Sequence, residues 1–354
     1  MLKENNSSIA FFLTRSLFLG FGVALMFQNA NKDAYIGAIL GTILGFGIIL
    51  IYSYLLSKKQ EFTLKELCLK NKIIGTLTRA LFLLTSFLIL IYTVIIFKIF
   101  IVSFMLVNTP ELLITIPFLI ISAYAAFKGL KVIGRVARSL FPLSIVSIIF
   151  TVFSLAGYIQ FEHFFPILDV GTLNIFKSTI IFTSISVFPN ILLFHLKTPK
   201  RIALNYLIGA ISIIFVLFIV NGIFGSELIT IFRFSEYMVL KQLKLLNFIE
   251  KVENILSIVW LFDLFITSMM AIYSIKEMLL KLQWIAMEYT AIRQSLFFSW
   301  LEHPSLSYER VRQTIVILTR MTGYEDEDIF SYLENSFESP FWDWGYFALI
   351  VGRP

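Results

Sequence analysis

Four residues that could bind a small molecule interrupt the apolar stretch Thr179 to Arg201, TIIFTSISVFPNILLFHLKTPKR: Ser184, Ser186, Pro189 and Asn190. Proline has no N–H to give to the carbonyl four residues earlier, and an unpaired carbonyl in hydrocarbon is costly. Such a break is tolerated where it lines a cavity enclosed by protein, so the stretch predicts a ligand site. An ordinary proline kink in a membrane helix is the alternative interpretation.

A second weak point lies in the first apolar segment, Ile9 to Asn29, where Gly20, Phe21 and Gly22 stand midway. Matched interruptions in corresponding helices of two halves are typical of inverted-repeat transporters. In those folds the ends of half-helices expose free N–H and C=O groups around the substrate. The two interruptions together predict one small polar chamber inside the membrane.

Asp263, Lys98 and Arg15 fall inside apolar segments, where ionisable groups are costly and tend to be functional. Asp263 needs a partner, a proton or a cation; it is a candidate for holding a coupling ion, or it stays protonated or bonds to a neighbouring helix. Lys98 either contributes to the site or extends towards the outer interface. Arg15, in the first turns of its segment, is interpreted as an interfacial anchor.

The sequence carries no pattern for enzyme chemistry. It has no phosphate-binding loop, zinc-binding helix, nucleophile triad or paired catalytic carboxylates in the membrane region. Three histidines and the single Cys68 do not supply a metal site or a disulfide. We therefore predict no catalytic residues, no metal and no cofactor.

The composition of the chain predicts that these residues are positioned by membrane-spanning helices. Hydrophobic residues make up 58% of the chain and charged residues 15%, with a mean hydropathy of +0.85, which is far from a soluble domain. We expect an all-α polytopic membrane protein without a separate signal peptide. The expected spans are about Ile9 to Asn29, Ala34 to Leu56, Ile73 to Val107, Leu112 to Phe127, Leu140 to Ile159, Thr179 to Leu196, Ile202 to Gly225 and Ile255 to Ile275.

The basic residues alternate between the loops and so predict an orientation. The loops after the second, fourth and sixth spans are rich in Lys and Arg, whereas those after the first, third and fifth carry only Lys32 and Lys177. This pattern places the N-terminus in the cytoplasm, and it explains the net charge of +6 better than nucleic-acid binding does. The longer loop Ser226 to Asn254 has a helical pattern and is expected to lie on the outer surface as an amphipathic helix.

The second span carries Gly37, Gly41 and Gly45 at four-residue spacing. Small residues on one face of a helix let another backbone approach closely. The stripe is therefore interpreted as a packing surface, with the lining of a pathway as the alternative.

Several runs between about Ile9 and Lys281 resemble the B subunit of spore germinant receptors, a family within the amino acid-polyamine-organocation (APC) transporter superfamily. The order and spacing of the runs carry the resemblance more than any one of them does. The runs are DAYIGAILG (Asp33 to Gly41), AYAAFKGLKVIGRVARSLFPLSI (Ala123 to Ile145), FFPILDVGTLNIFKSTI (Phe164 to Ile180), KTPKR (Lys197 to Arg201), GSELITIFRFSEYMVLKQ (Gly225 to Gln242) and FIEKVENILSIVWLF (Phe248 to Phe262).

The resemblance implies an APC/LeuT-like inverted-repeat helix bundle that senses nutrient germinants, commonly amino acids, together with A and C partner subunits. It implies the inner membrane of a dormant spore as the location. An amino-acid permease of the same superfamily is the alternative function. The implied ligand-binding residues are Gly20, Phe21, Gly22, Val23, Ser184, Ser186, Phe188, Pro189, Asn190 and Asp263, and Lys98 is added to them because of its place inside a span.

The chain changes character after about Lys281, so we predict two domains, residues 1–281 and 282–354. The first holds 24 Lys and Arg against 13 Asp and Glu, whereas the second holds 5 against 10 and four of the five tryptophans. The expected ninth and tenth spans are missing from this tail, which instead predicts soluble or interfacial helices of unknown origin. The predicted tail helices are Leu282 to Glu302, Ser305 to Met321 and Glu325 to Phe337.

Overall fold

A computed structural model describes residues 7–58, 72–107, 109–193, 199–242 and 252–298. Its contacts divide the chain into two compact units, residues 1–279 and 280–354. The first unit is built from helices, and no β-strand occurs among the described residues. Because the candidate site lies in this unit, the description below concerns it alone.

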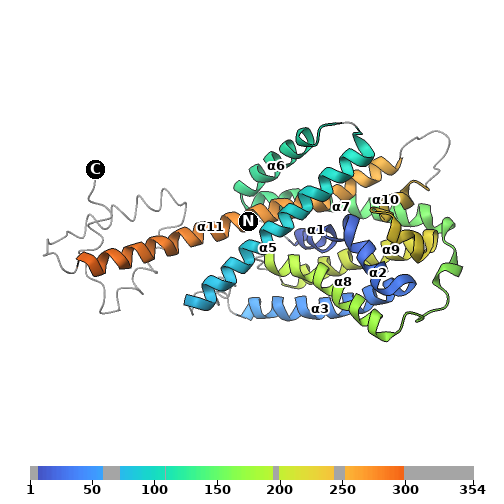
Figure 1. Cartoon of the computed structure of the whole chain (residues 1–354), viewed down its shortest axis with the longest axis horizontal. Helices are drawn as coiled ribbons and strands as arrows, with labels where there is room; N and C mark the ends of the chain where they lie inside the picture. Colours follow the sequence, from blue (N-terminus) through green and yellow to red (C-terminus); the bar gives the residue numbers. More distant parts are fainter. Residues whose placement is uncertain (1–6, 59–71, 108, 194–198, 243–251, 299–354) are drawn as a thin grey trace. The chain divides into compact units, whose positions relative to one another are not determined.

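The described residues form a series of helices (Figure 1). Their bounds are α1 Ser8–Ser16, the wide turn η1 Phe18–Gly22, α2 Val23–Ala30, η2 Asn31–Asp33, α3 Ala34–Lys58, α5 Lys72–Phe100, η3 Ile101–Met105, α6 Glu111–Phe127, α7 Leu130–Leu155, η4 Ala156–Tyr158, η5 Phe161–Phe164, α8 Thr172–Leu193, α9 Pro199–Ile231, α10 Ser235–Leu240 and α11 Val252–Phe298.

Helices stand at each of the eight predicted spans, which confirms a polytopic membrane helix bundle. Five described segments are long and apolar enough to cross a membrane, and the first of them, Ser8–Tyr52, contains the first two predicted spans. The shorter helix Glu111–Phe127 is also apolar. The two-repeat arrangement of the APC superfamily stays a prediction.

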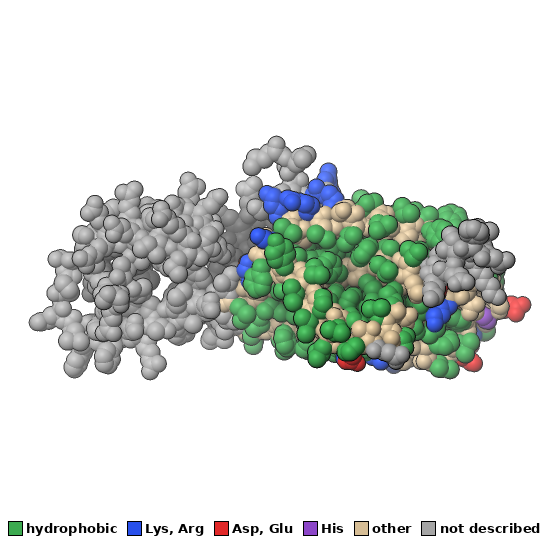
Figure 2. Space-filling view, turned by 90° about the horizontal axis from the view of Figure 1, so that it is seen from above, with side chains coloured by type: hydrophobic (Ala, Val, Ile, Leu, Met, Phe, Trp, Pro, Cys, Tyr) green, Lys and Arg blue, Asp and Glu red, His purple; other side chains and the backbone are tan. Residues whose placement is uncertain are grey.

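Large apolar side chains cover the outside of the first unit, as expected for a surface that faces lipid. On the face shown in Figure 2, hydrophobic side chains dominate and the charged ones lie mostly towards the edges. Helix α6 illustrates this, since Leu112, Leu113 and Ile120 are 70%, 66% and 61% exposed.

Helices α1 and α3 each pack against both α8 and α9 (Figure 1). The glycine stripe of α3 is the contact surface, which confirms the packing interpretation. A Cβ at Gly37 would meet the side chain of Ser178, and one at Gly41 would lie 2.9 Å from Phe182, both on α8. Gly45 faces Tyr206 of α9. Close approach of three helix backbones therefore depends on these glycines.

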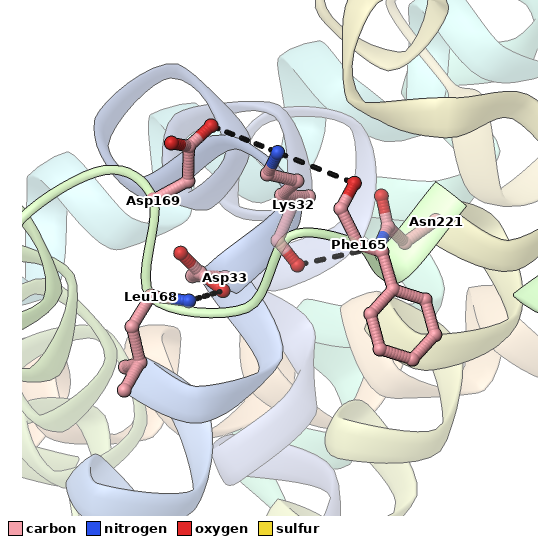
Figure 3. A network of polar contacts seen from close by, with 6 residues as sticks. All are labelled: Lys32, Asp33, Phe165, Leu168, Asp169 and Asn221. Atoms are coloured by element: carbon pink, nitrogen blue, oxygen red, sulfur yellow. Dashed lines mark hydrogen bonds and ion pairs between the residues drawn. The ribbon is translucent and has the colours of Figure 1, made fainter. Parts of the chain in front are cut away.

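A polar network ties the connection before α8 to the end of the first helix (Figure 3). Lys32 forms an ion pair of 2.9 Å with Asp169, and Asp33 accepts a 3.1 Å hydrogen bond from the backbone N–H of Leu168. Asn221 of α9 donates a 3.2 Å hydrogen bond to the backbone carbonyl of Lys32. The network fixes the turn between α2 and α3 against α9.

The prediction of a surface helix over Ser226 to Asn254 is wrong for the part that the structure describes. Helix α9 bends at Gly225, where φ is 69° and ψ 158°, and then continues to Ile231. The short α10 follows, and five of its six residues are buried. Residues 243–251 lie outside the described residues. The pattern was misread because the apolar residues of α10 pack into the bundle instead of resting on lipid.

For the predicted tail, the described residues end within the first of its three helices. Helix was expected from Leu282 to Glu302, and α11 ends at Phe298. The other two predicted tail helices, and the loop that holds Cys68, lie outside the described residues.

Candidate functional site

The first helix is interrupted at the predicted place. Between α1 and α2, Leu19 takes an extended conformation with ψ 122°, and Gly20 takes a left-handed one with φ 76°. Glycine adopts positive φ without a steric penalty, whereas other L-residues do so rarely. The prediction of a break at Gly20, Phe21 and Gly22 is thus confirmed for the backbone.

The groups that the break frees are bound by side chains from distant segments. The Tyr92 hydroxyl of α5 lies 2.9 Å from the carbonyl oxygen of Leu19 and 3.2 Å from that of Leu17. The backbone N–H of Gly20 donates a 2.5 Å hydrogen bond to Oε1 of Glu236 in α10. The polar backbone of the break is therefore satisfied inside the protein, as an interruption at membrane depth requires.

A cavity of about 380 Å³ opens beside the break. It lies between the first helix, α5 and the end of α9. Polar groups converge on it from Tyr92, Gln28, Thr230 and Arg233, while the remaining lining is mainly apolar. Its lining residues are Gly20, Phe21, Ala24, Gln28, Tyr92, Ile96, Thr230, Ile231, Phe232 and Arg233.

Glu236, which bonds to the break at Gly20, is buried, with 3% of its surface exposed. Its carboxylate accepts hydrogen bonds from the Gly20 N–H and, at 3.4 Å, from the Ser235 hydroxyl. Burial raises the pKa of Glu236 to about 7, because removal from water disfavours the charged form, and the hydrogen bonds offset only part of this effect. The carboxyl can thus change its protonation state near neutral pH.

The predicted interruption in the sixth span is wrong. Helix α8 runs from Thr172 to Leu193 with Pro189 inside it. The side chain of Asn190 donates to the carbonyl of Ser186 at 2.8 Å, beside the proline, and to the Thr14 hydroxyl at 2.9 Å. Because α8 continues through Pro189, the alternative of an ordinary proline residue within a helix holds.

The other predicted residues of α8 face different ways. Ser186 is fully buried and shares a 3.0 Å hydrogen bond with the Tyr206 hydroxyl. Ser184 and Phe188 are exposed on the outside of the first unit. None of these residues lines the cavity beside Gly20, where the break faces α5 and the end of α9.

Asp263 has its expected partner, which is Arg15. Their side chains form an ion pair of 3.1 Å, and each is 5% exposed. The Arg15 guanidinium also lies 4.8 Å above the ring of Phe11. The interpretation of Arg15 as an interfacial anchor is therefore wrong, because the residue is buried and joins α1 to α11.

Buried polar atoms without a hydrogen-bond partner among the described residues gather around this pair. They are Arg15 Nε and Nη1, Asp263 Oδ1, Asn190 Oδ1 and Thr267 Oγ1. Such atoms in an interior are commonly satisfied by ordered water.

Three further residues of the predicted site, Lys98, Val23 and Gly22, make contacts that explain them structurally. Lys98 forms a 2.6 Å ion pair with Glu111 at the start of α6, and both side chains are partly exposed. Val23 is buried at the start of α2. A Cβ at Gly22 would lie 2.8 Å from the carbonyl oxygen of Leu17, so this glycine is needed for the turn itself.

Comparison with known proteins assigns the chain to a family. A family model described as "Spore germination protein" matches residues 6–284. The chain belongs to the spore germination protein family. It is also similar to the "Putative spore germination protein YfkT" of Bacillus subtilis (strain 168), with 24% identity over 245 residues, which is 67% of each chain.

Membership in the spore germination protein family indicates the process in which this protein takes part. It supports a membrane protein of germination, a transporter or a sensor, in agreement with the resemblance found in the sequence. The described part of the chain offers no group of three or more His, Cys, Asp or Glu side chains that could hold a metal ion.

Sequence reasoning missed Glu236, Tyr92 and Arg233 in this spore germination family member. The signal for Glu236 was present as the single acid in FRFSEYMV, an otherwise apolar and aromatic run. Its partner, Gly20, is 216 residues away, so no local pattern could join them.

Proposed function

We propose that this chain is the nutrient-sensing membrane subunit of a spore germinant receptor, with an amino acid as its germinant. The observation that carries the proposal is the interrupted first helix with the cavity of about 380 Å³ beside it. That volume falls at the lower end of the range of about 300 to 1,000 Å³ for ligand pockets, as a small nutrient requires.

The lining of the cavity suits a zwitterion. The Arg233 guanidinium offers a two-pronged donor for a carboxylate. The Gln28 amide and Thr230 hydroxyl supply neutral donors and acceptors. Phe21, Ile96 and Ile231 add apolar surface for a small side chain.

The proposal includes the location and partners that the family resemblance implies. The subunit would act with A and C partner subunits in the inner membrane of the dormant spore, with its N-terminus in the cytoplasm. In that orientation α2 leads from the break to the outer side, so the cavity receives nutrients that enter the spore from outside.

Germination assays test the proposal. A strain that lacks this subunit, exposed to single amino acids, sugars and nucleosides, should lose its response to an amino acid, and the wild-type gene should restore it. Arg233→Gln should raise the half-maximal amino-acid concentration about tenfold or more, since a hydrogen bond to a charged group contributes about 1.5 to 3 kcal/mol.

Arg201→Gln is the matched control, because Arg201 is an exposed arginine at the opposite end of α9. This control should respond as the wild type does. An unchanged amino-acid response in the deletion strain, or equal shifts in the two arginine variants, contradicts the proposal.

Transport is the competing outcome, because the family also supports a transporter. Uptake of the labelled amino acid into proteoliposomes separates the two. Binding without accumulation supports a sensor, whereas robust accumulation identifies an amino-acid permease.

A further inference from the structure

The first turns of helix α7 carry a row of positive charge. Lys131, Arg135 and Arg138 are all exposed, and spacings of three or four residues place them on one face of the helix. These three side chains form the basic face of α7. Lys128 directly follows α6, and the sequence from 112 to 161 holds these four basic residues and no acidic one. The charge of the basic face is therefore not balanced by an acid within this part of the sequence.

The same side of the helix becomes apolar after Arg138. Val146, Ile149 and Phe153 lie on it, again at spacings of three or four residues, and they are 63%, 50% and 77% exposed. The opposite side packs into the bundle, where Ile133 is fully buried. Exposed apolar side chains on a membrane helix face lipid. The basic face points in the same direction, so it looks out toward the lipid and away from the bundle.

The length of α7 places the basic face at the depth of the lipid headgroups. The predicted span Leu140 to Ile159 has about 20 residues, which at about 1.5 Å per residue already matches a hydrocarbon core of about 30 Å. By the same rise, Arg138 and Arg135 lie about 3 and 8 Å beyond the core, within a headgroup region of about 5 to 8 Å. Lys131 lies one turn further out, and its long side chain can reach back to that region.

The end of α6 carries a second sign of the membrane–water interface. Tyr124 and Phe127 are 65% and 64% exposed. The Lys128 ammonium lies 5.5 Å from the centre of the Tyr124 ring, and that of Lys276 in α11 lies 5.7 Å from the centre of the Phe127 ring. Exposed tyrosines are enriched where a membrane meets water. Tyr124 therefore indicates, independently of α7, that the headgroups lie at this end of the helices.

We propose that the basic face of α7 binds the headgroups of anionic phospholipids. A guanidinium pairs with a phosphate through two parallel hydrogen bonds, and phosphate is the anion that a lipid presents at this depth. Several cations without an acid beside them favour a headgroup with a net negative charge over a zwitterionic one. A protein partner would have to displace lipid from the apolar side that continues the basic face. This surface is separate from the cavity, so the inference does not depend on the proposed function.

Lipid bound at the basic face also affects the first helix, because α7 packs against α1. The rings of Phe141 and Phe11 meet edge to face, with 5.1 Å between their centroids. Phe141 follows Arg138 by about one helical turn. A headgroup held by Arg138 therefore stabilises the part of α7 on which α1 rests, and we expect anionic lipid to stabilise the folded chain.

Lipid binding by the purified full chain tests the inference. Native mass spectrometry in a neutral detergent measures the affinity for phosphatidylglycerol, which is anionic, and for phosphatidylcholine, which is zwitterionic. The test variant combines Lys131→Gln, Arg135→Gln and Arg138→Gln. A second protein, with Arg135→Lys and Arg138→Lys, keeps the charges of the basic face and should keep the preference for the anionic lipid.

The matched control removes the same charges from scattered positions. It combines Lys177→Gln, Arg201→Gln and Arg233→Gln, and all three positions are exposed. Both triple variants therefore lose one lysine and two arginines, and they have the same net charge. A difference between them reports the clustering of the cations on α7 and not the total charge of the protein.

The wild type should bind phosphatidylglycerol on the order of a hundredfold more tightly than phosphatidylcholine, since each cation at a membrane surface contributes about fivefold. The variant without the basic face should bind the two lipids alike, whereas the control should keep most of the preference. Equal losses in the two triple variants would show a general effect of charge and overturn the inference. Unchanged binding in the variant without the basic face would overturn it as well, and would favour a protein partner for this surface.

A single position decides the outcome if the triple variant fails to fold. Arg135→Gln should weaken the binding of phosphatidylglycerol about fivefold, whereas Arg135→Lys, which keeps the charge, should weaken it less. Phosphatidylglycerol should also raise the midpoint of thermal unfolding of the wild type, because a ligand of the folded state stabilises it, and this rise should be smaller in Arg135→Gln. Equal affinities and equal rises in Arg135→Gln and the wild type contradict the inference.

Discussion

The first helix and α8 each contain a residue that disturbs regular helical hydrogen bonding, yet the chain is interrupted in only one of them. At Gly20 the backbone turns through a left-handed conformation, whereas α8 passes through Pro189 without interruption. The two sites also differ in their partners. The break is bound by Tyr92 and Glu236 from distant segments, while beside the proline in α8 the Asn190 side chain donates to the carbonyl of Ser186.

The comparison shows that a missing N–H does not by itself open a helix in a membrane protein. Helix α8 loses one backbone hydrogen bond at Pro189 and otherwise keeps its helical course. A backbone that does leave exposes several polar groups, and each must find a partner elsewhere. The break at Gly20 persists because α5 and α10 bring those partners to it.

The largest expected effect concerns the half of the first helix before the break, which Arg15 fixes to α11. Asp263→Leu leaves a buried guanidinium without its counter-ion, since the pair is 5% exposed on both sides. The loss should be on the order of 3 to 5 kcal/mol, seen as a much lower midpoint of thermal unfolding in detergent.

The double variant Arg15→Met with Asp263→Leu removes both charges and is the control for this prediction. It should recover most of the lost stability, because two apolar side chains can replace a buried ion pair. Equal stability of the single variant and the wild type would mean that the pair does not hold α1 in place.

The next effect tests the break itself. Gly20→Ala forces a Cβ into a left-handed backbone and against the Phe234 ring, so it should cost roughly 2 to 4 kcal/mol and loosen α10. Thermal unfolding measures the loss. The matched variant is Gly47→Ala in α3, where a Cβ meets nothing within 4 Å and stability should hold or rise slightly. Similar losses in both variants would show that Gly20 is not a special position.

These two predictions indicate which features were accessible from the sequence. The helices follow from runs of apolar residues, and the break follows from glycines midway along one run, because both depend on residues close in the chain. The packing surface formed by the α3 glycines could also be predicted, since their four-residue spacing alone places them on one face of the helix.

The features that were missed depend on distant partners. Arg15 looked like an anchor because its pairing with Asp263 joins the first and last described spans. Pro189 looked like a break because the packing of α8 against α3, which is distant in the chain, is not visible in the sequence. Glu236 looked like part of a surface helix because the amide that it binds lies 216 residues earlier.

A smaller effect concerns the proton on Glu236. Its pKa rises from an ordinary 4.5 to about 7 through burial, so the folded protein holds this proton more tightly than the unfolded chain does. The resulting stability is fully present below about pH 4.5 and is lost as the pH rises through 7. The charged or titratable groups around it are Tyr92 of α5, which interacts with it electrostatically, and Arg233 and Lys241 on either side of α10.

Glu236→Gln removes this titration. Thermal unfolding should therefore show that the stability of the variant, relative to that of the wild type, rises as the pH increases from 4.5 to 8. The gain should be on the order of 3 kcal/mol, complete by about pH 8. If the difference in stability between the two proteins were constant across this pH range, Glu236 would have the same proton affinity in the folded and the unfolded chain.

The smallest expected effect is at the proline. Because α8 is already helical on both sides of Pro189, Pro189→Ala should change the free energy of unfolding by less than about 1 kcal/mol and leave the germination response unaltered. Pro142→Ala in α7, another proline inside a helix, is the matched control and should behave alike. If Pro189→Ala kept the stability but abolished the response, α8 would have to open during signalling. The ligand would then bind between two interrupted helices, and the break at Gly20 alone would not account for it.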